Sequence, residues 1–422
     1  MNPTEAEPTK DVIVVGAGAA GQIAAVAAAR AGRSVAIFEQ MPQPGRKILA
    51  SGGGRCNLTN LTTPDEVAAA FGRQGRFVLP ALEALEPGGL QKIMAELHLP
   101  TVAEEGGKVF PAGHKAVHVE NALRHTMEEL GVVMRVSCPV ERLWIEGGVL
   151  RGVETRDSEF LSARCVILAC GGRSWAELGG TGGGYALARQ SGHTITPLTP
   201  ALVPLIARET WCAKLAGVSL SNARICLAAR GESKAGLTGD VLFTHKGLSG
   251  PAILDISGDV ARQIACRRAA TLKIEFLAGV DAAAWAERLD TWRTTQGRSG
   301  IVKCLKPCLP ASLCEVLCEQ ANLDPRTPAA ELPREGRRRL SALLGGAELT
   351  IIDTEGFETA FVTRGGVRLR DVDPETLQSK LLPGLFFAGE LLDLDGPTGG
   401  YNLRWAFSSG LLAGRAAAGR RA

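Results

Sequence analysis

The chain contains 422 residues, of which 45% are hydrophobic and 22% are charged, and its formal net charge at pH 7 is +3. This length is too great for one simple core, so we expect two or three domains of an ordinary globular protein. The near-neutral charge excludes a global field that would attract nucleic acid or an anionic membrane. We expect a small-molecule substrate as the partner, with no nucleic acid and no membrane, and the oligomeric state stays open.

The cysteines and the N-terminal residues indicate the compartment. Eleven cysteines are an odd number spread over a long chain, which argues against a disulfide framework. Residues 1–10 lack the basic and apolar regions of a signal peptide, so we expect a disordered tail. The stretch 12–31 is rich in small residues, and its glycines fit a phosphate-binding turn better than a membrane helix. These features predict a cytoplasmic protein.

Residues 11–21 place an apolar, β-branched run directly before a GxGxxG motif, and an alanine-rich helical pattern follows. The run is typical of a buried parallel strand. Gly16 permits a tight turn, Gly18 lets the backbone approach a pyrophosphate, and Gly21 lets the helix pack on the strand. The diphosphate would lie on the free N–H groups at the helix N-terminus.

A second apolar run, residues 34–38, ends at Glu39, which follows Gly21 by 18 residues. This is the spacing expected of the acid that binds ribose hydroxyls. The order of strand, motif, helix, strand and acid predicts a dinucleotide-binding βαβ unit. Which dinucleotide binds is open at this point.

Residues 47–60 concentrate glycines, hydroxyls and amides where the cofactor would extend toward its reactive ring. Arg55 and Asn57 can donate hydrogen bonds to ring carbonyls or phosphate oxygens, and a flexible surface loop is the alternative. Cys56 is a weak catalytic candidate, as a redox partner or a covalent tether whose thiolate Arg55 would favour. A small buried packing residue is the more ordinary interpretation.

The next elements alternate between helical and extended patterns. Helical patterns cover residues 64–97 and 116–130, and short strands are expected at 132–136, 141–145 and 150–154. Another buried strand, residues 163–170, runs directly into two glycines. The glycine-rich segment 179–184 resembles a second phosphate loop, but no strand precedes it directly, so it is a weak nicotinamide candidate.

The character changes from about residue 196. Short alternating runs at 223–229, 241–244 and 272–276 predict a β-rich domain, and residues 281–345 predict helices. His245 could face the ring as a proton donor, or be an ordinary turn histidine. Basic clusters are expected on solvated helix faces because no aromatic residues are interleaved with them, and they lie at residues 267–268, 337–339 and 420–421.

Four cysteines at 304, 308, 314 and 318 invite a metal-site interpretation. Their three-residue gaps differ from the two-residue knuckles of zinc and iron–sulfur sites, and prolines interrupt the helix. Core packing is therefore the favoured role, with a redox switch left open. We expect no metal.

The C-terminal part returns to a nucleotide-binding pattern. Residues 383–389 read as a buried strand, and Gly399, Gly400 and Asn402 open the last helix. Such a helix start would suit the negative charge that develops at the N1 and C2 carbonyl edge of a reduced flavin; a plain capping loop is the alternative. Because nucleotide-binding sequence occurs at both ends, we expect an inserted module.

Several segments together resemble the bacterial FAD-binding oxidoreductases of the aminoacetone oxidase-like and bile-acid 4,6-reductase-like family. The matching segments are 16–21, 45–47, 51–60, 109–111, 169–172, 200–204, 242–251, 363–366 and 384–403. The resemblance implies an α/β fold with a Rossmann-like FAD-binding domain of the glutathione reductase type, an inserted β-barrel-like domain and a small helical domain. The expected ranges are 11–195 and 348–422 for the FAD-binding domain, 196–280 for the β-rich domain, with a returning strand near 348–362 as an option, and 281–347 for the helical domain.

The resemblance also implies non-covalently bound FAD and a set of residues around it. The segment 174–184 departs from the family's usual Thr-Gly-Ser-Thr-Gly-Asp-Gly pattern, so the resemblance does not carry a substrate with it. The expected cofactor-binding residues are Gly16, Gly18, Ala19, Ala20, Gly21, Glu39, Gln40, Arg46, Lys47, Ser51, Gly52, Arg55, Cys56, Asn57, Val140, Gly171, Gly389, Glu390, Gly399, Gly400, Tyr401, Asn402 and Leu403.

The resulting hypothesis is an FAD-dependent oxidoreductase that passes a hydride between a small organic substrate, or NAD(P)H, and flavin N5. The flavin itself would carry the chemistry. Whether the enzyme is an oxidase or a reductase, and whether it prefers NADH or NADPH, stays open. The alternatives are a flavin-dependent RNA-modifying enzyme and a non-catalytic FAD-binding redox sensor that uses Cys56 or the 304–318 cysteines as its switch.

Overall fold

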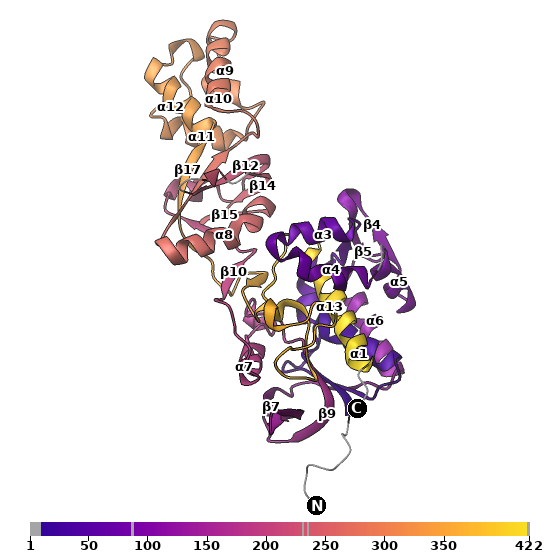
Figure 1. Ribbon diagram of the computed structural model, residues 1–422. Coiled ribbons are helices and arrows are strands. Elements are labelled where there is room, and N and C mark those ends of the chain that lie inside the picture. Colours follow the sequence, from indigo (N-terminus) through magenta and orange to yellow (C-terminus); the bar gives the residue numbers. More distant parts are fainter. Residues whose placement is uncertain (1–9, 86–87, 230–231, 234–235, 420–422) are drawn as a thin grey trace, which may run out of the picture. The chain divides into compact units, whose positions relative to one another are not determined.

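A computed structural model describes residues 10–85, 88–229, 232–233 and 236–419 (Figure 1). The tail expected at residues 1–10 lies outside the described residues except for Lys10, which begins the first strand. The chain divides into two compact units, residues 1–198 with 362–422 and residues 199–361. We call them the first unit and the inserted unit.

The first unit is built on a parallel sheet with the order β6-β2-β1-β9-β19. β2, β19 and β1 from Val12 onward are almost wholly buried, as strands covered on both faces must be. β7 and β8 continue from the start of β9 as an antiparallel meander. The strands of this sheet are β1 (Lys10–Val15), β2 (Val35–Phe38), β6 (Val133–Arg135), β7 (Val140–Glu146), β8 (Val149–Thr155), β9 (Phe160–Leu168) and β19 (Leu385–Phe387).

Helices and a small antiparallel sheet complete the first unit. The helical pattern at 64–97 forms three helices; a glycine-containing turn separates the first two, and the second ends at Glu83. The helices are α1 (Ala19–Arg30), α2 (Arg46–Ala50), α3 (Pro64–Ala70), α4 (Gly75–Glu83), α5 (Gly89–Glu96), α6 (Ala116–Glu129), α7 (Gly183–Gln190) and α13 (Tyr401–Gly419). The small sheet has the order β3-β5-β4, from β3 (Thr59–Asn60), β5 (Lys108–Pro111) and β4 (Thr101–Ala103), and β18 (Val362–Arg364) follows the insert.

Glycines let α1 and α13 lie side by side although they come from opposite ends of the chain (Figure 1). A Cβ at Gly410 would lie 2.2 Å from the Ala20 carbonyl oxygen, and one at Gly414 would lie 2.4 Å from that of Ala24. Any larger residue would force the two backbones apart. This close packing places the middle of α13 beside the first turn of α1.

The inserted unit contains a closed six-stranded sheet in the order β12-β14-β15-β11-β17-β16, where β16 pairs back to β12. Closure leaves no exposed edge among these six strands. The strands are β11 (Leu205–Ala207), β12 (Ser219–Ala229), β14 (Leu237–Phe243), β15 (Gly247–Ser249), β16 (Ala270–Glu275) and β17 (Ala347–Thr354), with β13 (Glu232–Ser233) beside β12; β10 (Thr199–Ala201) precedes them. β17 pairs with β11 and β16, so it matches the returning strand given as an option near 348–362. The inserted unit therefore extends to Phe361, beyond the boundary at residue 347 that was expected without this strand.

The helices of the inserted unit are α8 (Pro251–Arg267), α9 (Ala282–Thr295), α10 (Ile301–Leu305), α11 (Ala311–Gln320) and α12 (Arg334–Leu344). Helices and barrel share one continuous hydrophobic core that includes Phe276 and Trp285. Cys304, Cys314 and Cys318 are buried in it, and burial raises the pKa of Cys314 and Cys318 to about 12. These thiols pack as small apolar groups.

Candidate cofactor site

The turn between β1 and α1 has the geometry that its three glycines require. Gly16 adopts a φ of +100°, and a Cβ there would lie 2.5 Å from the Ala169 carbonyl oxygen. A Cβ at Gly21 would lie 1.8 Å from the Gly16 carbonyl oxygen, which explains the close packing of helix on strand. A Cβ at Gly18 would meet no protein atom within 4 Å. Gly18 therefore faces open space.

The N-terminus of α1 offers donors to that space. Its N-cap, Gly18, has no side chain to cap the helix, and the first turn, which includes Ala19 and Ala20, contains no acidic residue. The first N–H groups of a helix have no partner within the helix and carry partial positive charge. An open volume above such donors fits a diphosphate.

Glu39 lies at the end of β2 beside this turn. Its carboxylate accepts the Ala17 N–H at 2.8 Å on Oε2 and the Met41 N–H at 2.8 Å on Oε1. Gln40 is exposed, and its Nε2 donates to the Gly179 carbonyl at 2.8 Å. The acid expected to bind ribose is thus held by the backbone on both sides.

A polar network joins four segments that are far apart in the sequence. Lys47 Nζ lies 2.7 Å from Glu390 Oε2 and donates to Ser174 Oγ at 2.9 Å. Glu390 Oε1 accepts from Ser174 Oγ at 2.8 Å and from the Thr363 N–H at 2.9 Å. Sequence reasoning singled out Lys47 and Glu390 but missed Ser174 and Thr363. The only signal for Thr363 was its place in a segment of the family resemblance.

The two glycine-rich blocks at 51–57 and 399–403 meet in the first unit. A Cβ at Gly400 would lie 3.0 Å from the Thr59 carbonyl carbon and 3.1 Å from Asn57 Oδ1. Gly399 and Gly400 both have positive φ, at 107° and 97°. Asn57 Oδ1 is buried and has no hydrogen-bond partner among the described residues. Only glycine fits at position 400, because of the positive φ and the close contacts of a Cβ there. Beside it, Asn57 Oδ1 is a buried acceptor that no described residue satisfies.

Two predicted residues use their polar groups within the protein. Asn402 closes the loop before α13, because its amide bonds both the N–H and the carbonyl of Gly396 at 2.8 Å. The Arg55 guanidinium lies 4.2 Å from the centre of the Phe110 ring, pairs with Glu104 and donates to His114 Nδ1 at 3.0 Å. The structure therefore gives these two side chains structural partners.

Cys56, within the 51–57 block, is fully buried, and burial raises the pKa of its thiol to about 11. A thiol in this setting is a poor nucleophile, since the thiolate is the reactive form. His245 lies in the exposed turn between β14 and β15 of the inserted unit. Among the described residues, the bonds of the Lys47 network do not include Cys56, and His245 belongs to the other unit.

The remaining predicted residues lie in loops and at element ends of the first unit. Gly171 has a φ of +69° with no protein atom within 4 Å of its Cβ position, and a Cβ at Gly389 would lie 3.0 Å from Ala20 Cβ. Ser51 Oγ donates to the Ile48 carbonyl at 2.7 Å, and Gly52 has a φ of +57°. Arg46 begins α2, Val140 begins β7, and Tyr401 and Leu403 lie in the first turn of α13.

Comparison with known proteins decides the family. A family model described as "HI0933-like protein Rossmann domain" matches residues 10–416. The chain belongs to the HI0933-like family. This membership confirms the expected resemblance and an FAD-binding Rossmann-type fold, and it makes the chain an FAD-dependent oxidoreductase.

Two relatives of this HI0933-like chain span nearly its whole length. It is 36% identical over 411 residues to a 3-dehydro-bile acid delta(4,6)-reductase of Clostridium scindens, covering 96% of this chain and 98% of the relative. It is 31% identical over 403 residues to a ribosomal RNA dihydrouridine synthase of Haemophilus influenzae, covering 94% and 96%.

Solved structures agree on the fold. The HI0933-like chain matches a 3-ketosteroid-delta4-(5alpha)-dehydrogenase of Rhodococcus jostii RHA1 with a TM-score of 0.53 at 17% identity, covering 99% of both chains. It matches a 3-ketosteroid delta1-dehydrogenase of Sterolibacterium denitrificans with a TM-score of 0.55 at 15% identity, covering 97% and 99%. At these identities the likeness shows the fold alone.

Two negative findings apply to the described residues of the HI0933-like chain. No group of three or more His, Cys, Asp and Glu side chains in this part of the chain is arranged to hold a metal ion. No helix within it combines the length and the apolar character needed to cross a membrane.

Proposed function

We propose that the chain is an FAD-dependent reductase that uses NAD(P)H to saturate a conjugated carbon–carbon double bond in a small organic substrate. The observation that carries the proposal is the 36% identity, over 96% of the chain, to a relative named for reduction at positions 4 and 6 of a 3-dehydro-bile acid. An oxidase that returns electrons to O2 is the alternative within the same class.

The site residues fit FAD in three places. Gly18 and the start of α1 would hold the diphosphate, and Glu39 would hold the adenosine ribose. Gly399 and Gly400 would let the flavin ring approach the backbone. There Asn57 Oδ1, which has no hydrogen-bond donor among the described residues, would accept one from the ring. When bound, the flavin supplies hydride transfer at N5.

The Lys47–Glu390 pair would position the link between the two halves of the cofactor. Its side chains are 30% and 19% exposed, so the pair is partly shielded from water. Hydrogen bonds from Ser174 and Thr363 hold the Glu390 carboxylate in place. The start of α13 would oppose negative charge at the N1 and C2 carbonyl edge. These groups orient and stabilise, and none of them is a nucleophile.

Saturating the double bond requires one hydride and one proton. The hydride originates from NAD(P)H, and the proton comes from solvent or a protein acid. Cys56 is unsuited to this role because it is fully buried. His245 has an exposed imidazole and stays a candidate, which a His245→Asn variant would test by its rate of product formation.

The test uses the purified, FAD-loaded protein without oxygen. NADH or NADPH is expected to bleach the flavin absorbance, and a 4,6-dien-3-one steroid is then expected to restore it with a saturated product. If neither nicotinamide bleaches the flavin, the reductase proposal is wrong. If only air restores the colour across an enone panel, the oxidase alternative is favoured.

A second candidate function is reduction of uridine in RNA. Two relatives named ribosomal RNA dihydrouridine synthase, at 31% and 30% identity, favour it. Against RNA binding, the basic residues of α12 are largely paired with carboxylates, which reduces the charge they can offer to phosphates: Arg338 forms two hydrogen bonds to Glu335, and Arg337 lies 3.4 Å from Asp290. Reoxidation of the reduced flavin by a uridine-containing transcript, with retention of RNA at moderate salt, would support this candidate.

A further inference from the structure

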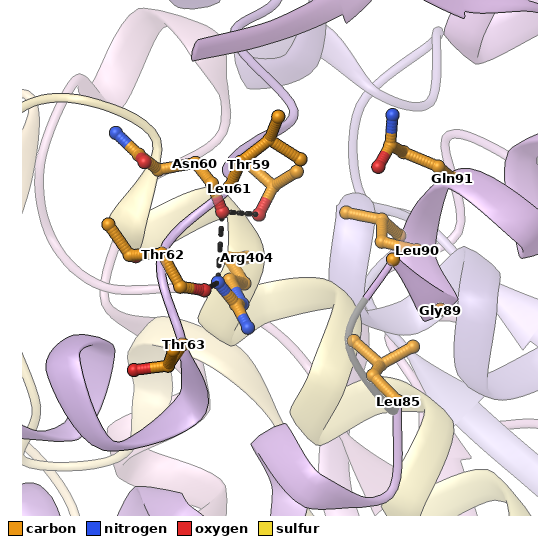
Figure 2. Close-up of a pocket in the computed structure, with 11 residues that line it drawn as sticks. Thr59, Asn60, Leu61, Thr62, Thr63, Leu85, Gly89, Leu90, Gln91 and Arg404 are labelled. Carbon is orange, nitrogen blue, oxygen red and sulfur yellow. Dashed lines mark hydrogen bonds between the residues drawn. The ribbon is translucent and has the colours of Figure 1, made fainter. Parts of the chain in front are cut away.

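A separate pocket of about 220 Å3 lies in the first unit between the 59–63 segment, the start of α5 and α13. Figure 2 shows Arg404 beside Asn60 and Thr62, with Leu85 and Leu90 across from them. Leu85 and Leu90 are each 5% exposed. The pocket therefore combines a cation with an apolar wall.

Arg404 is buried, at 5% exposure, which is costly for a charged group without a counterion. Its Nη1 donates to the carbonyls of Asn60 at 3.0 Å and Thr62 at 2.9 Å. Within residues 10–85 and 88–419, as far as the structure describes them, no carboxylate lies within ion-pair distance of it. Desolvation by burial also lowers the pKa of Arg404.

The start of α5 adds a second positive group. Its N-cap, Gly88, supplies no capping side chain, and its first turn contains no acidic residue. Gly88, Gly89, Leu90 and Gln91 all line the pocket. The partial positive charge of an uncapped helix start thus lies at the same pocket as the buried guanidinium.

A hydroxyl in the pocket is also unsatisfied. Thr62 Oγ1 is buried and has no hydrogen-bond partner among the described residues. The neighbouring hydroxyls are already used, because Thr63 caps α3 and Thr59 donates to the Asn60 carbonyl at 3.3 Å. Among the described residues, an unused hydroxyl donor, a guanidinium without a carboxylate partner and an uncapped helix start line one small volume.

We propose that this pocket binds a small organic monoanion, with its carboxylate on Arg404, Thr62 and the start of α5 and its apolar part against Leu85 and Leu90. A single guanidinium and one helix start match one negative charge, and the leucines favour a short hydrocarbon body over inorganic phosphate. This site is independent of the proposed reaction.

Butyrate is the probe, titrated calorimetrically into the FAD-loaded protein, with butyramide and inorganic phosphate as comparison ligands. We expect butyrate to bind in the millimolar range or tighter and butyramide at least about tenfold more weakly, because only the first carries charge. Equal affinity for the two ligands, or no butyrate binding, would overturn the proposal, and tighter binding of phosphate would overturn the apolar part of it.

Three variants locate the site. Thr62→Val removes a hydroxyl that bonds no described residue, so butyrate affinity should fall about threefold to tenfold without loss of thermal stability. Gln91→Glu places a carboxylate in the first turn of α5 and should raise stability while weakening butyrate binding. Arg404→Met should weaken binding most, and because this change can also loosen the 59–63 segment, the first two variants decide the outcome.

Glu86 is adjacent to Leu85 in the sequence and lies outside the described residues. Glu86→Gln therefore serves as the remaining control. We expect unchanged butyrate affinity in this variant. A tenfold increase in butyrate affinity would indicate that Glu86 is the ion-pair partner of Arg404. That result would contradict a site for an external anion. The flavin absorbance of each variant reports the cofactor site separately, so the two proposals can fail independently.

Discussion

The ammonium of Lys47 lies 2.7 Å from the carboxylate of Glu390, although 343 residues separate them in the chain. This pair ties the segment after β2 to the segment before α13. Ser174 bonds both side chains and the Thr363 N–H bonds Glu390, so one network connects four segments of the first unit. The cofactor proposal depends on this convergence.

Breaking the Lys47–Glu390 pair should weaken both the fold and FAD binding. We expect Lys47→Met and Glu390→Gln each to raise the Kd for FAD about tenfold. A double-mutant cycle on the free energy of unfolding should give a coupling energy of about 1–2 kcal/mol, between the values of exposed and fully buried ion pairs. Arg30→Met removes an exposed pair with Glu96 of the same length and is the matched control, with little expected effect. A coupling near zero would contradict the role of the network.

The three glycines of the first turn should respond differently to alanine. Gly18→Ala should fold, with a loss within about 1 kcal/mol, but bind FAD at least about tenfold more weakly, since its Cβ enters the open space above α1. Gly21→Ala should fail to fold, because its Cβ would lie 1.8 Å from a carbonyl oxygen. FAD titration and thermal unfolding measure the two effects. Normal FAD binding by Gly18→Ala would show that the diphosphate lies elsewhere.

Acid should destabilise the first unit through His193. This imidazole is 3% exposed between Ser191 Oγ at 2.9 Å and Ser379 Oγ at 3.0 Å, and desolvation lowers its pKa. The unfolded chain then binds more protons, so the free energy of unfolding should decrease as pH falls below about 6.5, toward the folded-state pKa.

Denaturant titrations between pH 8 and about pH 5 measure this effect. The slope with pH should be smaller in His193→Asn, because the group that titrates differently in the two states is gone. The exposed His125→Asn is the control and should keep the wild-type slope. An unchanged slope in His193→Asn would assign the acid sensitivity to other groups.

Cys56 should be inert toward thiol reagents in the folded protein. Burial raises its pKa to about 11, whereas Cys266 is exposed. Brief treatment with iodoacetamide at neutral pH should therefore modify Cys266 and leave Cys56 unmodified, as peptide mass analysis would show. Cys56→Ser should keep flavin reduction by NAD(P)H. Rapid labelling of Cys56 would instead revive a redox role for this residue.

The sequence by itself determined the elements whose signals are local. The β-branched run, the three glycines and Glu39 specify a βαβ turn because each acts through the sterics of its own backbone or of one adjacent helix. The block around Gly400 was recognisable for the same reason. The family resemblance then indicated that the cofactor is FAD, because the spacing of the glycines and the acid is common to all dinucleotide-binding turns.

Only the tertiary structure decided which distant segments meet. Residues 347–354 belong to the barrel because their partners are β11 and β16, and strand pairing across long stretches of chain leaves no periodic trace in either strand. The same holds for the Lys47–Glu390 pair, for the internal partners of Arg55 and Asn402, and for the burial of Arg404. A side chain's partner and its exposure are set by packing of the whole unit, and local sequence specifies only which groups are available to be packed.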